Sequence, residues 1–172
     1  WIFEHDGRLK GNPIELYRDL LYPNDPQVSY HMSPPTVADF DGDGQPEIAV
    51  ATTRTRFPWD ANDLGRFIVV VLRPDGSRQW QREFFPFTNS NAGSPPVAAF
   101  DFDGDGAAEL VYFDQQKLYL LNGRDGTTLF EMAVDHTQAL LPNQYPTIAD
   151  VDNLGNAEII VPTTAYYPGF AG

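Results

Sequence analysis

The sequence predicts an all-β fold built from repeated units of four antiparallel strands. A nine-residue acidic frame, Asp-x-Asp-x-Asp-Gly-x-x-Glu, occurs in full at residues 39–47 and 101–109 and in altered form at residues 150–158. Equivalent positions of successive copies lie roughly 50 to 60 residues apart, a spacing typical of propeller blades and not of helical repeats. Strand patterns and glycine turns recur around the copies. We therefore expect one β-sheet unit for every copy of the frame.

The segments that flank the frames predict the strands, which we name A to D within each unit. Proline-led segments enter strand A, at a position where the missing amide donors do little harm. Each frame forms the A–B turn. Strands C and D are joined by Asp-Gly or Asn-Gly turns, because these residues supply the positive backbone angles that a hairpin needs. Strand A is expected within 33–38, 94–99 and 145–149, strand B at 48–50, 110–112 and 159–161, strand C at 67–72 and 118–121, and strand D at 79–84 and 128–132.

These units define the expected domain organisation, a single β-propeller segment that spans residues 1–172. Residues 34–88 and 95–136 each make a complete blade of four antiparallel strands. Residues 1–30 supply a half blade, with strands C and D followed by a loop that has at most one helical turn, and residues 145–172 supply strands A and B of another half blade. This is fewer than the four to eight blades that close a propeller. We therefore expect the chain to belong to a larger propeller or to assemble with other chains.

The acidic frame has the composition of a calcium-binding loop. Calcium takes about six to eight oxygen ligands, and alternate carboxylates around a glycine turn supply several of them from a short stretch of chain. The frame begins like an EF-hand loop, but its glutamate stands at position nine instead of twelve and leads into a strand instead of a helix. We therefore predict strand-loop-strand calcium sites. Their role is expected to be structural, because one loop fills most of the coordination sphere and leaves little room for a substrate.

The predicted ligands occupy equivalent positions in each frame. Positions one, three, five and nine offer carboxylates, and position seven offers its backbone carbonyl, so its side chain is free to vary. The third copy has Leu154 where the fifth-position carboxylate should stand, and we expect this site to bind calcium more weakly than the two strong sites. The predicted metal ligands are Asp39, Asp41, Asp43, Gln45, Glu47, Asp101, Asp103, Asp105, Ala107, Glu109, Asp150, Asp152, Asn156 and Glu158.

Composition narrows the classes of partner and the compartment. The chain has 24 acidic and 11 basic residues and a formal net charge of −13, which argues against nucleic acid and anionic membrane surfaces as partners. It contains no run of about 18 apolar residues that would insert into a membrane. Cysteine is absent, so disulfides and thiolate metal sites are excluded. Sites of moderate calcium affinity with oxygen ligands are occupied where free calcium is near millimolar, which is the case outside the cell. We therefore expect an extracellular or cell-surface location.

At these frames the chain resembles the FG-GAP and VCBS-type repeats of bacterial surface proteins, which are related to the propeller repeats of integrin alpha chains. The resemblance is specific at residues 37–47 and at the corresponding second and third copies. The resemblance implies a calcium-stabilised β-propeller used for adhesion or ligand display. The glutamates at position nine, Glu47, Glu109 and Glu158, are closer to the bacterial version than to the integrin version, which usually closes its cage with aspartate.

The leading functional expectation is a non-enzymatic module of an extracellular adhesin, scaffold or appendage, because every strong signal in the sequence is architectural. The alternative is a polysaccharide lyase, since rhamnogalacturonan lyases carry propellers with similar cages. Lyase chemistry needs a base and a cation at a uronate. The sequence shows no concentrated set of Lys, Arg, His and Tyr residues that could supply them. His5, His31 and His136 stand in unrelated repeat positions and predict no shared site. The sequence has neither a nucleophile elbow nor a phosphate-binding glycine loop.

Two long B–C loops carry aromatic residues that suit a binding partner. Such side chains stack on sugar rings or anchor proteins, which keeps a carbohydrate-binding lectin open as a third class. They could equally pack on a neighbouring blade. The candidate partner-binding residues are Arg56, Phe57, Trp59, Tyr166, Tyr167 and Phe170. The expected partners are therefore other chains or the remainder of a larger polypeptide, together with a glycan or a cell-surface protein.

Overall fold

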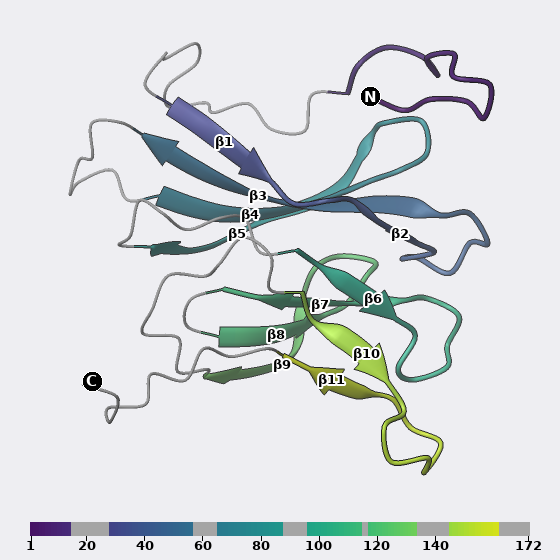
Figure 1. Ribbon diagram of the computed structural model, residues 1–172, viewed down its shortest axis with the longest axis vertical. Helices are drawn as coiled ribbons and strands as arrows, with labels where there is room; N and C mark the ends of the chain where they lie inside the picture. The colour runs from purple at the N-terminus through teal and green to yellow at the C-terminus, as the bar shows by residue number, and fades with distance from the viewer. Residues whose placement is uncertain (15–27, 57–64, 88–95, 115–116, 134–144, 162–172) are drawn as a thin grey trace, which may run out of the picture.

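The computed structural model describes residues 1–14, 28–56, 65–87, 96–114, 117–133 and 145–161 (Figure 1). The first sheet contains β1 (Val28–Met32), β2 (Thr36–Ala38), β3 (Glu47–Arg56), β4 (Gly65–Leu72) and β5 (Arg78–Phe87). The second sheet contains β6 (Ala98–Phe100), β7 (Glu109–Phe113), β8 (Lys117–Leu121) and β9 (Thr128–Ala133), and a two-stranded sheet contains β10 (Thr147–Ala149) and β11 (Glu158–Ile160). The described residues form no helix, and so none that could cross a bilayer. The predicted all-β fold class is confirmed.

Each unit follows the predicted order of strands A to D. β2, β3, β4 and β5 pair in succession, and so do β6, β7, β8 and β9, with every pairing antiparallel. β10 and β11 pair in the same way as strands A and B. The three acidic frames therefore lie at the three A–B turns. This arrangement is that of propeller blades, and none of the sheets closes on itself within the described ranges.

The first sheet has an additional strand, β1, in a segment where the sequence indicated only a loop. β1 pairs with the far half of the ten-residue β3, and β2 pairs with the near half, so together they act as one interrupted strand. Ser33 lies at the interruption. Its amide donates to the Ala51 carbonyl oxygen at 2.8 Å, and its hydroxyl accepts from the Ala51 amide at 3.1 Å. The two bonds keep the edge of β3 paired where Pro34 and Pro35 have no amide to donate.

Residues 1–10 turn back on themselves but form no named strand. A single antiparallel β-bridge joins Phe3 and Leu9. The Gly7 amide donates to the Glu4 carbonyl oxygen at 2.9 Å and closes the turn. The hairpin expected for this segment is thus a tight turn with one bridge.

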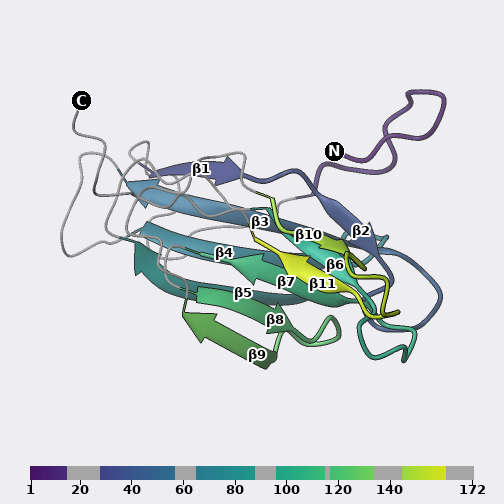
Figure 2. The same cartoon turned by 60° about the horizontal axis from the view of Figure 1, so that its bottom comes forward.

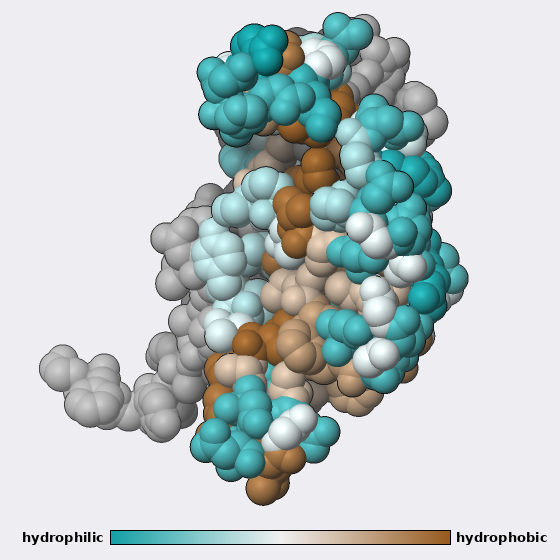
Figure 3. Space-filling view, turned by 90° about the vertical axis from the view of Figure 1, so that its right-hand side faces the viewer, coloured by the Kyte–Doolittle hydropathy of each residue, from teal (hydrophilic) through white to brown (hydrophobic). Residues whose placement is uncertain are grey.

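The sheets stack with their strands A side by side. β6 lies beside β2 on one side and beside β10 on the other, in both views of the ribbon (Figures 1 and 2). Seen from the side of the frame loops, apolar residues form a band that runs down the molecule between more hydrophilic groups (Figure 3). Exposed apolar side chains on the strands A include Val37 and Phe100. The stack places the three frames along one side of the protein.

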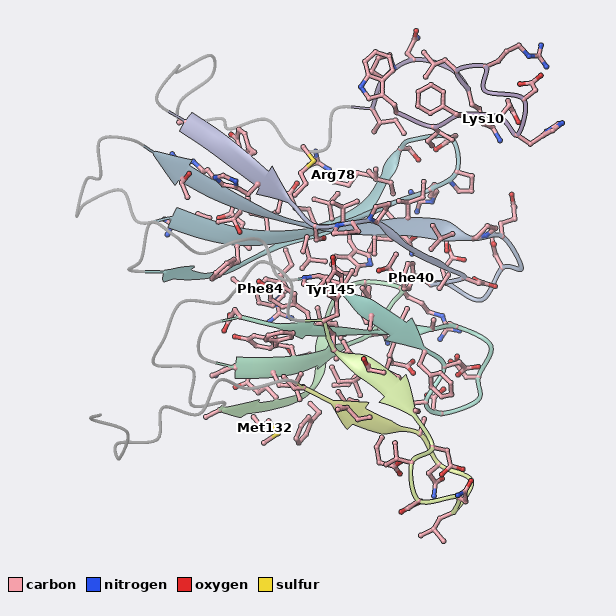
Figure 4. All side chains as sticks on the ribbon, in the orientation of Figure 1. Lys10, Phe40, Arg78, Phe84, Met132 and Tyr145 are labelled. Carbon is pink, nitrogen blue, oxygen red and sulfur yellow. The ribbon has the colours of Figure 1, made fainter. Side chains whose placement is uncertain are left out.

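The main hydrophobic core fills the space between the first and second sheets (Figure 4). The ring centroid of Phe84 lies 4.6 Å from that of Tyr112 and 4.9 Å from that of Tyr119. The Arg82 guanidinium lies over the Phe84 ring, 4.8 Å from its centroid, which adds a cation–π contact. Phe40, from the first frame, is fully buried in the same core. The first frame is therefore anchored in the contact between the two blades.

Apolar surface remains at both ends of the stack. On the outer face of the first sheet, Ile14 packs against Ile68, Val70 and Leu72 beside a hollow of about 600 Å³. At the other end, Phe130 and Met132 of β9 are about half exposed. Met132 lies on the side of the second sheet that faces away from the first sheet (Figure 4). Contiguous apolar patches of this kind mark interaction surfaces.

Candidate metal centre

The first two frames fold into the same loop. The carboxylate of Asp39 accepts hydrogen bonds from the amides of Gly42 at 2.7 Å and Gly44 at 2.8 Å. Asp101 accepts from the equivalent amides of the second frame at 2.8 and 3.0 Å. Gly42 and Gly44 have φ values of 79° and 86°, a conformation that glycine adopts without steric strain. The aspartate at position one thus organises the turn, and the glycines allow the backbone to curl around it.

Acidic side chains converge within every frame. The residues whose candidate ligand atoms lie within 4.8 Å of one another are Asp39, Asp41 and Asp43 in the first frame, Asp101, Asp103 and Glu109 in the second, and Asp150, Asp152 and Glu158 in the third. Carboxylates at this separation repel, and a divalent cation among them would offset that repulsion. A donor set made only of oxygen atoms suits a hard cation such as calcium or magnesium.

The glutamate at position nine ties strand B back to the loop. Oε2 of Glu47 accepts the amide of Phe40 at 2.9 Å. Glu109 and Glu158 accept the equivalent amides of their own frames at 2.8 and 2.9 Å. Glu47 and Glu109 are both buried, which is unusual for glutamates that have no positively charged partner among the described residues. Each loop is therefore closed from both ends by a carboxylate.

The electrostatics of these carboxylates favour a bound cation. Burial raises the pKa of the Glu47 carboxyl, and the charges of Asp41, Asp43 and Asp39 raise it further. Burial and the neighbouring aspartates likewise raise the pKa of Glu109. Burial acts in the same direction on Asp39, but hydrogen bonds from backbone amides hold its pKa below the usual 3.8. A nearby cation would therefore stabilise the ionised forms of Glu47 and Glu109.

The third frame keeps the loop despite its altered sequence. Asp150 accepts the amides of Leu154 at 3.2 Å and Gly155 at 2.9 Å. Asn153, with φ of 59°, takes the left-handed position that glycine holds in the other frames. The Leu154 side chain is 77% exposed and offers no ligand. Three acidic groups still converge here, and the weaker affinity expected for this site stays a prediction.

In the first two frames, a hydrogen bond from the amide fixes the backbone at position seven. The amide of Gln45 donates to Asp43 Oδ1 at 2.7 Å, and that of Ala107 donates to Asp105 Oδ1 at 2.8 Å. These bonds hold the peptide next to the carboxylates. Coordination by the carbonyls of Gln45, Ala107 and Asn156 remains a prediction.

The candidate partner-binding residues fall almost entirely outside the described part of the chain. The backbone of Arg56 ends β3 and pairs with Val28 of β1. The remaining five, Phe57, Trp59, Tyr166, Tyr167 and Phe170, lie outside the described residues.

Arg124 approaches both complete frames, although the sequence indicated only a turn at this position. It lies between β8 and β9. Its Nε donates to the carbonyl oxygen of Asp41 at 3.1 Å, and its Nη1 donates to Asp105 Oδ2 at 2.8 Å. The amide of Ala107 and the Arg124 guanidinium together hold the pKa of Asp105 below its usual value. The bond to Asp41 spans 83 residues of sequence, so no local pattern reveals it.

The two complete frames also contact each other directly. The amide of Ala108 donates to the carbonyl oxygen of Asp39 at 2.7 Å. Gly123 lies so close to both loops that a Cβ there would stand 2.1 Å from the Ala108 carbonyl oxygen and 2.7 Å from that of Phe40. Neighbouring candidate metal sites therefore share one packed joint between the blades.

Comparison with known proteins identifies part of this architecture. Residues 39–112 match the family model described as FG-GAP-like repeat. No curated protein matches the chain in sequence. The fold is similar to a rhamnogalacturonan lyase PL11 of Bacillus licheniformis, with 20% identity and a TM-score of 0.45 over 63% of this chain and 24% of that one. It is also similar to the V. cholerae biofilm matrix protein Bap1, with 18% identity and a TM-score of 0.46 over 73% of this chain and 24% of that one.

The chain spans about a quarter of the length of each of these two structures. The segment that matches the family model begins at Asp39, the first residue of the first frame, and ends at Tyr112 in strand B of the second blade. It therefore contains both complete acidic frames, whereas Gly123 and Arg124 of the joint lie beyond it. The resemblance noted in the sequence is confirmed for this segment: residues 39–112 of the chain match the model of an FG-GAP-like repeat.

Proposed function

We propose that the chain is a calcium-stabilised, non-catalytic β-propeller module that serves adhesion, surface scaffolding or appendage assembly outside the cell. The proposal rests on one observation above all, the convergence of three acidic groups within 4.8 Å in each of three equivalent turns. Repetition of the same loop in the same place of each unit is expected for a structural metal site. A calcium ion in each loop would join strands A and B, because its ligands come from both sides of the turn.

Calcium at these sites would act mainly on stability. At free calcium of about 100 times the dissociation constant, each site adds about 2.7 kcal/mol to the free energy of unfolding. Typical domains have a margin of about 5 to 15 kcal/mol in total. Two strong sites would therefore decide whether the blades stay folded. In the calcium-poor cytosol such loops would remain mostly empty, which is why we propose an extracellular or cell-surface location.

The partners that we propose follow from the two apolar ends of the stack. The hollow beside Ile14 and the half-exposed Met132 on β9 both present apolar surface. Further blades of a larger polypeptide, or other chains, would cover these surfaces. A glycan or a cell-surface protein would then be bound by the assembled propeller.

Titration calorimetry with calcium on chelator-treated protein tests the proposal. Two tight equivalents and a third weaker one are expected, and a double variant, Asp39→Asn with Asp101→Asn, should lose the two tight equivalents. Absence of calcium binding by the wild-type protein would contradict the proposal. Incubation with a uronate-containing polysaccharide completes the test, because formation of an unsaturated product would indicate a lyase, and glycan binding without product would indicate a lectin.

A further inference from the structure

We propose that Arg124 couples the first two calcium sites, so that calcium in one loop raises the affinity of the other. The inference depends on the proposed calcium-binding function and concerns the regulation of the same sites. It stands on the geometry of the joint between the two blades.

The Arg124 guanidinium bridges two predicted ligands that belong to different loops. Nε bonds to the backbone carbonyl of Asp41, at position three of the first frame, at 3.1 Å. Nη1 bonds to the carboxylate of Asp105, at position five of the second frame, at 2.8 Å. A Cβ added to Gly42 would stand 3.1 Å from Nη2, so the guanidinium also packs against the first loop. One planar group thus fixes the relative positions of the two loops.

The turn that carries Arg124 is held by strand β5 of the first sheet. The indole Nε1 of Trp80 donates to the Gly123 carbonyl oxygen at 2.7 Å. Gln79 Nε2 donates to the carbonyl oxygen of Arg124 itself at 3.2 Å, and Arg82 Nη1 donates to that of Gly126 at 2.8 Å. The guanidinium is therefore presented from a backbone that is fixed to the neighbouring blade.

These contacts give the coupling a positive sign. Calcium in the second loop would fix Asp105 and with it the guanidinium of Arg124. The guanidinium, bonded to the Asp41 carbonyl, would then order the first loop before its own ion arrives. When one ion has ordered a shared element, the second ion meets a smaller entropic cost, which is positive cooperativity.

The charge of Arg124 acts in the opposite direction, because it repels both ions. Its side chain is 46% exposed, so salt screens this repulsion. The hydrogen-bonded bridge does not depend on long-range charge. Lysine at this position would keep the charge, but a single ammonium lacks the planar fork that reaches two acceptors at once. The variants Arg124→Lys and Arg124→Ala therefore separate the effect of the bridge from that of the charge.

A calcium titration followed by NMR on nitrogen-15-labelled protein tests the coupling, because the amides of Gly44 and Gly106 report on the two loops separately. With the second site disabled by Asp101→Asn, the calcium affinity of the first loop should fall at least about fivefold. The same Asp101→Asn change in an Arg124→Ala or Arg124→Lys background should leave the first loop unaffected. Arg73→Ala removes an exposed arginine from the equivalent turn of the first sheet and should preserve the coupling.

Each outcome of this experiment decides a separate point. Coupling that persists in both Arg124 variants, or in the lysine variant alone, overturns the role of the bridge. If Asp101→Asn prevents folding, the wild-type titration still decides, because the Gly44 and Gly106 curves should be steeper than single-site isotherms there and return to single-site isotherms in Arg124→Ala. Wild-type curves that already follow single-site isotherms would overturn the inference. Absence of any calcium response at either glycine would contradict the proposed function itself.

Discussion

The indole nitrogen of Trp80 donates a hydrogen bond to the carbonyl oxygen of Gly123 at 2.7 Å, across the boundary between the two sheets. Trp80 belongs to β5 of the first blade, and Gly123 to the β8–β9 turn of the second. Both residues are buried. The bond holds this turn against the loops of both complete acidic frames, and the candidate metal sites and the blade contact therefore form one structural unit.

The close approach at Gly123 predicts a strong effect of a single added methyl group. A Cβ at this position would stand 2.1 Å from the Ala108 carbonyl oxygen, so backbone has to move. We expect Gly123→Ala to lower the free energy of unfolding by about 2 to 3 kcal/mol, measured by urea denaturation. Trp80→Phe keeps an aromatic ring but removes the hydrogen bond, and it should cost only about 1 kcal/mol. Wild-type stability of Gly123→Ala would contradict the close packing of Gly123 against the two loops.

A pair of substitutions in the first frame distinguishes a side-chain ligand from a backbone ligand. Glu47 is buried with its carboxylate at the loop, whereas the Gln45 side chain is exposed. Glu47→Gln should therefore weaken calcium binding at the first site, and Gln45→Ala should leave it unchanged, both measured by titration calorimetry. A loss of affinity in Gln45→Ala would mean that its side chain, not its carbonyl, contacts the ion.

The third frame predicts a gain of function. Leu154 stands at position five with 77% of its surface exposed, so an aspartate there would disturb no packing. Leu154→Asp should raise the calcium affinity of the third site by roughly an order of magnitude, because affinity in such loops follows the number of charged ligands. Leu154→Ala is the matched control and should leave affinity unchanged. Equal affinities of the aspartate and alanine variants would exclude position five as a ligand position.

The pH dependence of the metal-free protein should reveal the repulsion within the frames. The pKa values of Glu47 and Glu109 are raised above 4.5 in the folded protein, so the folded state binds protons more readily than the unfolded chain. Stability then falls as the pH rises through these folded pKa values, and it recovers as the pH falls below them. Asp39 and Asp105, with lowered pKa values, lose their stabilising effect only at pH near or below their usual 3.8.

Metal-free protein should therefore gain stability as the pH falls from neutral through the raised pKa values of Glu47 and Glu109, and saturating calcium should remove this trend. Urea midpoints at several pH values, with chelator or with calcium, provide the measurement. Glu47→Gln should reduce the trend in the metal-free protein. A steady loss of metal-free stability across the same pH range would show that the repulsion is absent.

The repeated frame made most of the fold predictable. Strands A and B lie directly before and after each frame, and the glycine turns near Gly76 and Gly126 mark the end of strand C, so strands β2 to β9 follow from local pattern. β1 was missed because its five residues pair with the extension of β3, and only the length of that partner reveals it. A pairing that depends on a distant strand leaves a weak local signal.

The candidate site, like the fold, could be predicted from the sequence only in part. The convergence of acidic groups could be predicted, because the ligands lie within nine residues of one another and the turn brings them together. Arg124 could not be predicted, since its contacts join residues 83 and 19 positions apart and depend on how the two blades pack. Tertiary packing, and not repeat periodicity, places this residue at the joint.

Thermal unfolding of chelator-treated protein, with and without added calcium, tests the central claim most directly. We predict that saturating calcium raises the melting temperature by roughly 10 to 20 °C if the two strong sites fill. The rise should follow the occupancy measured by calorimetry and should be largely lost in the Asp39→Asn and Asp101→Asn double variant. Identical melting curves with and without calcium would contradict the claim that these repeated loops are structural metal sites.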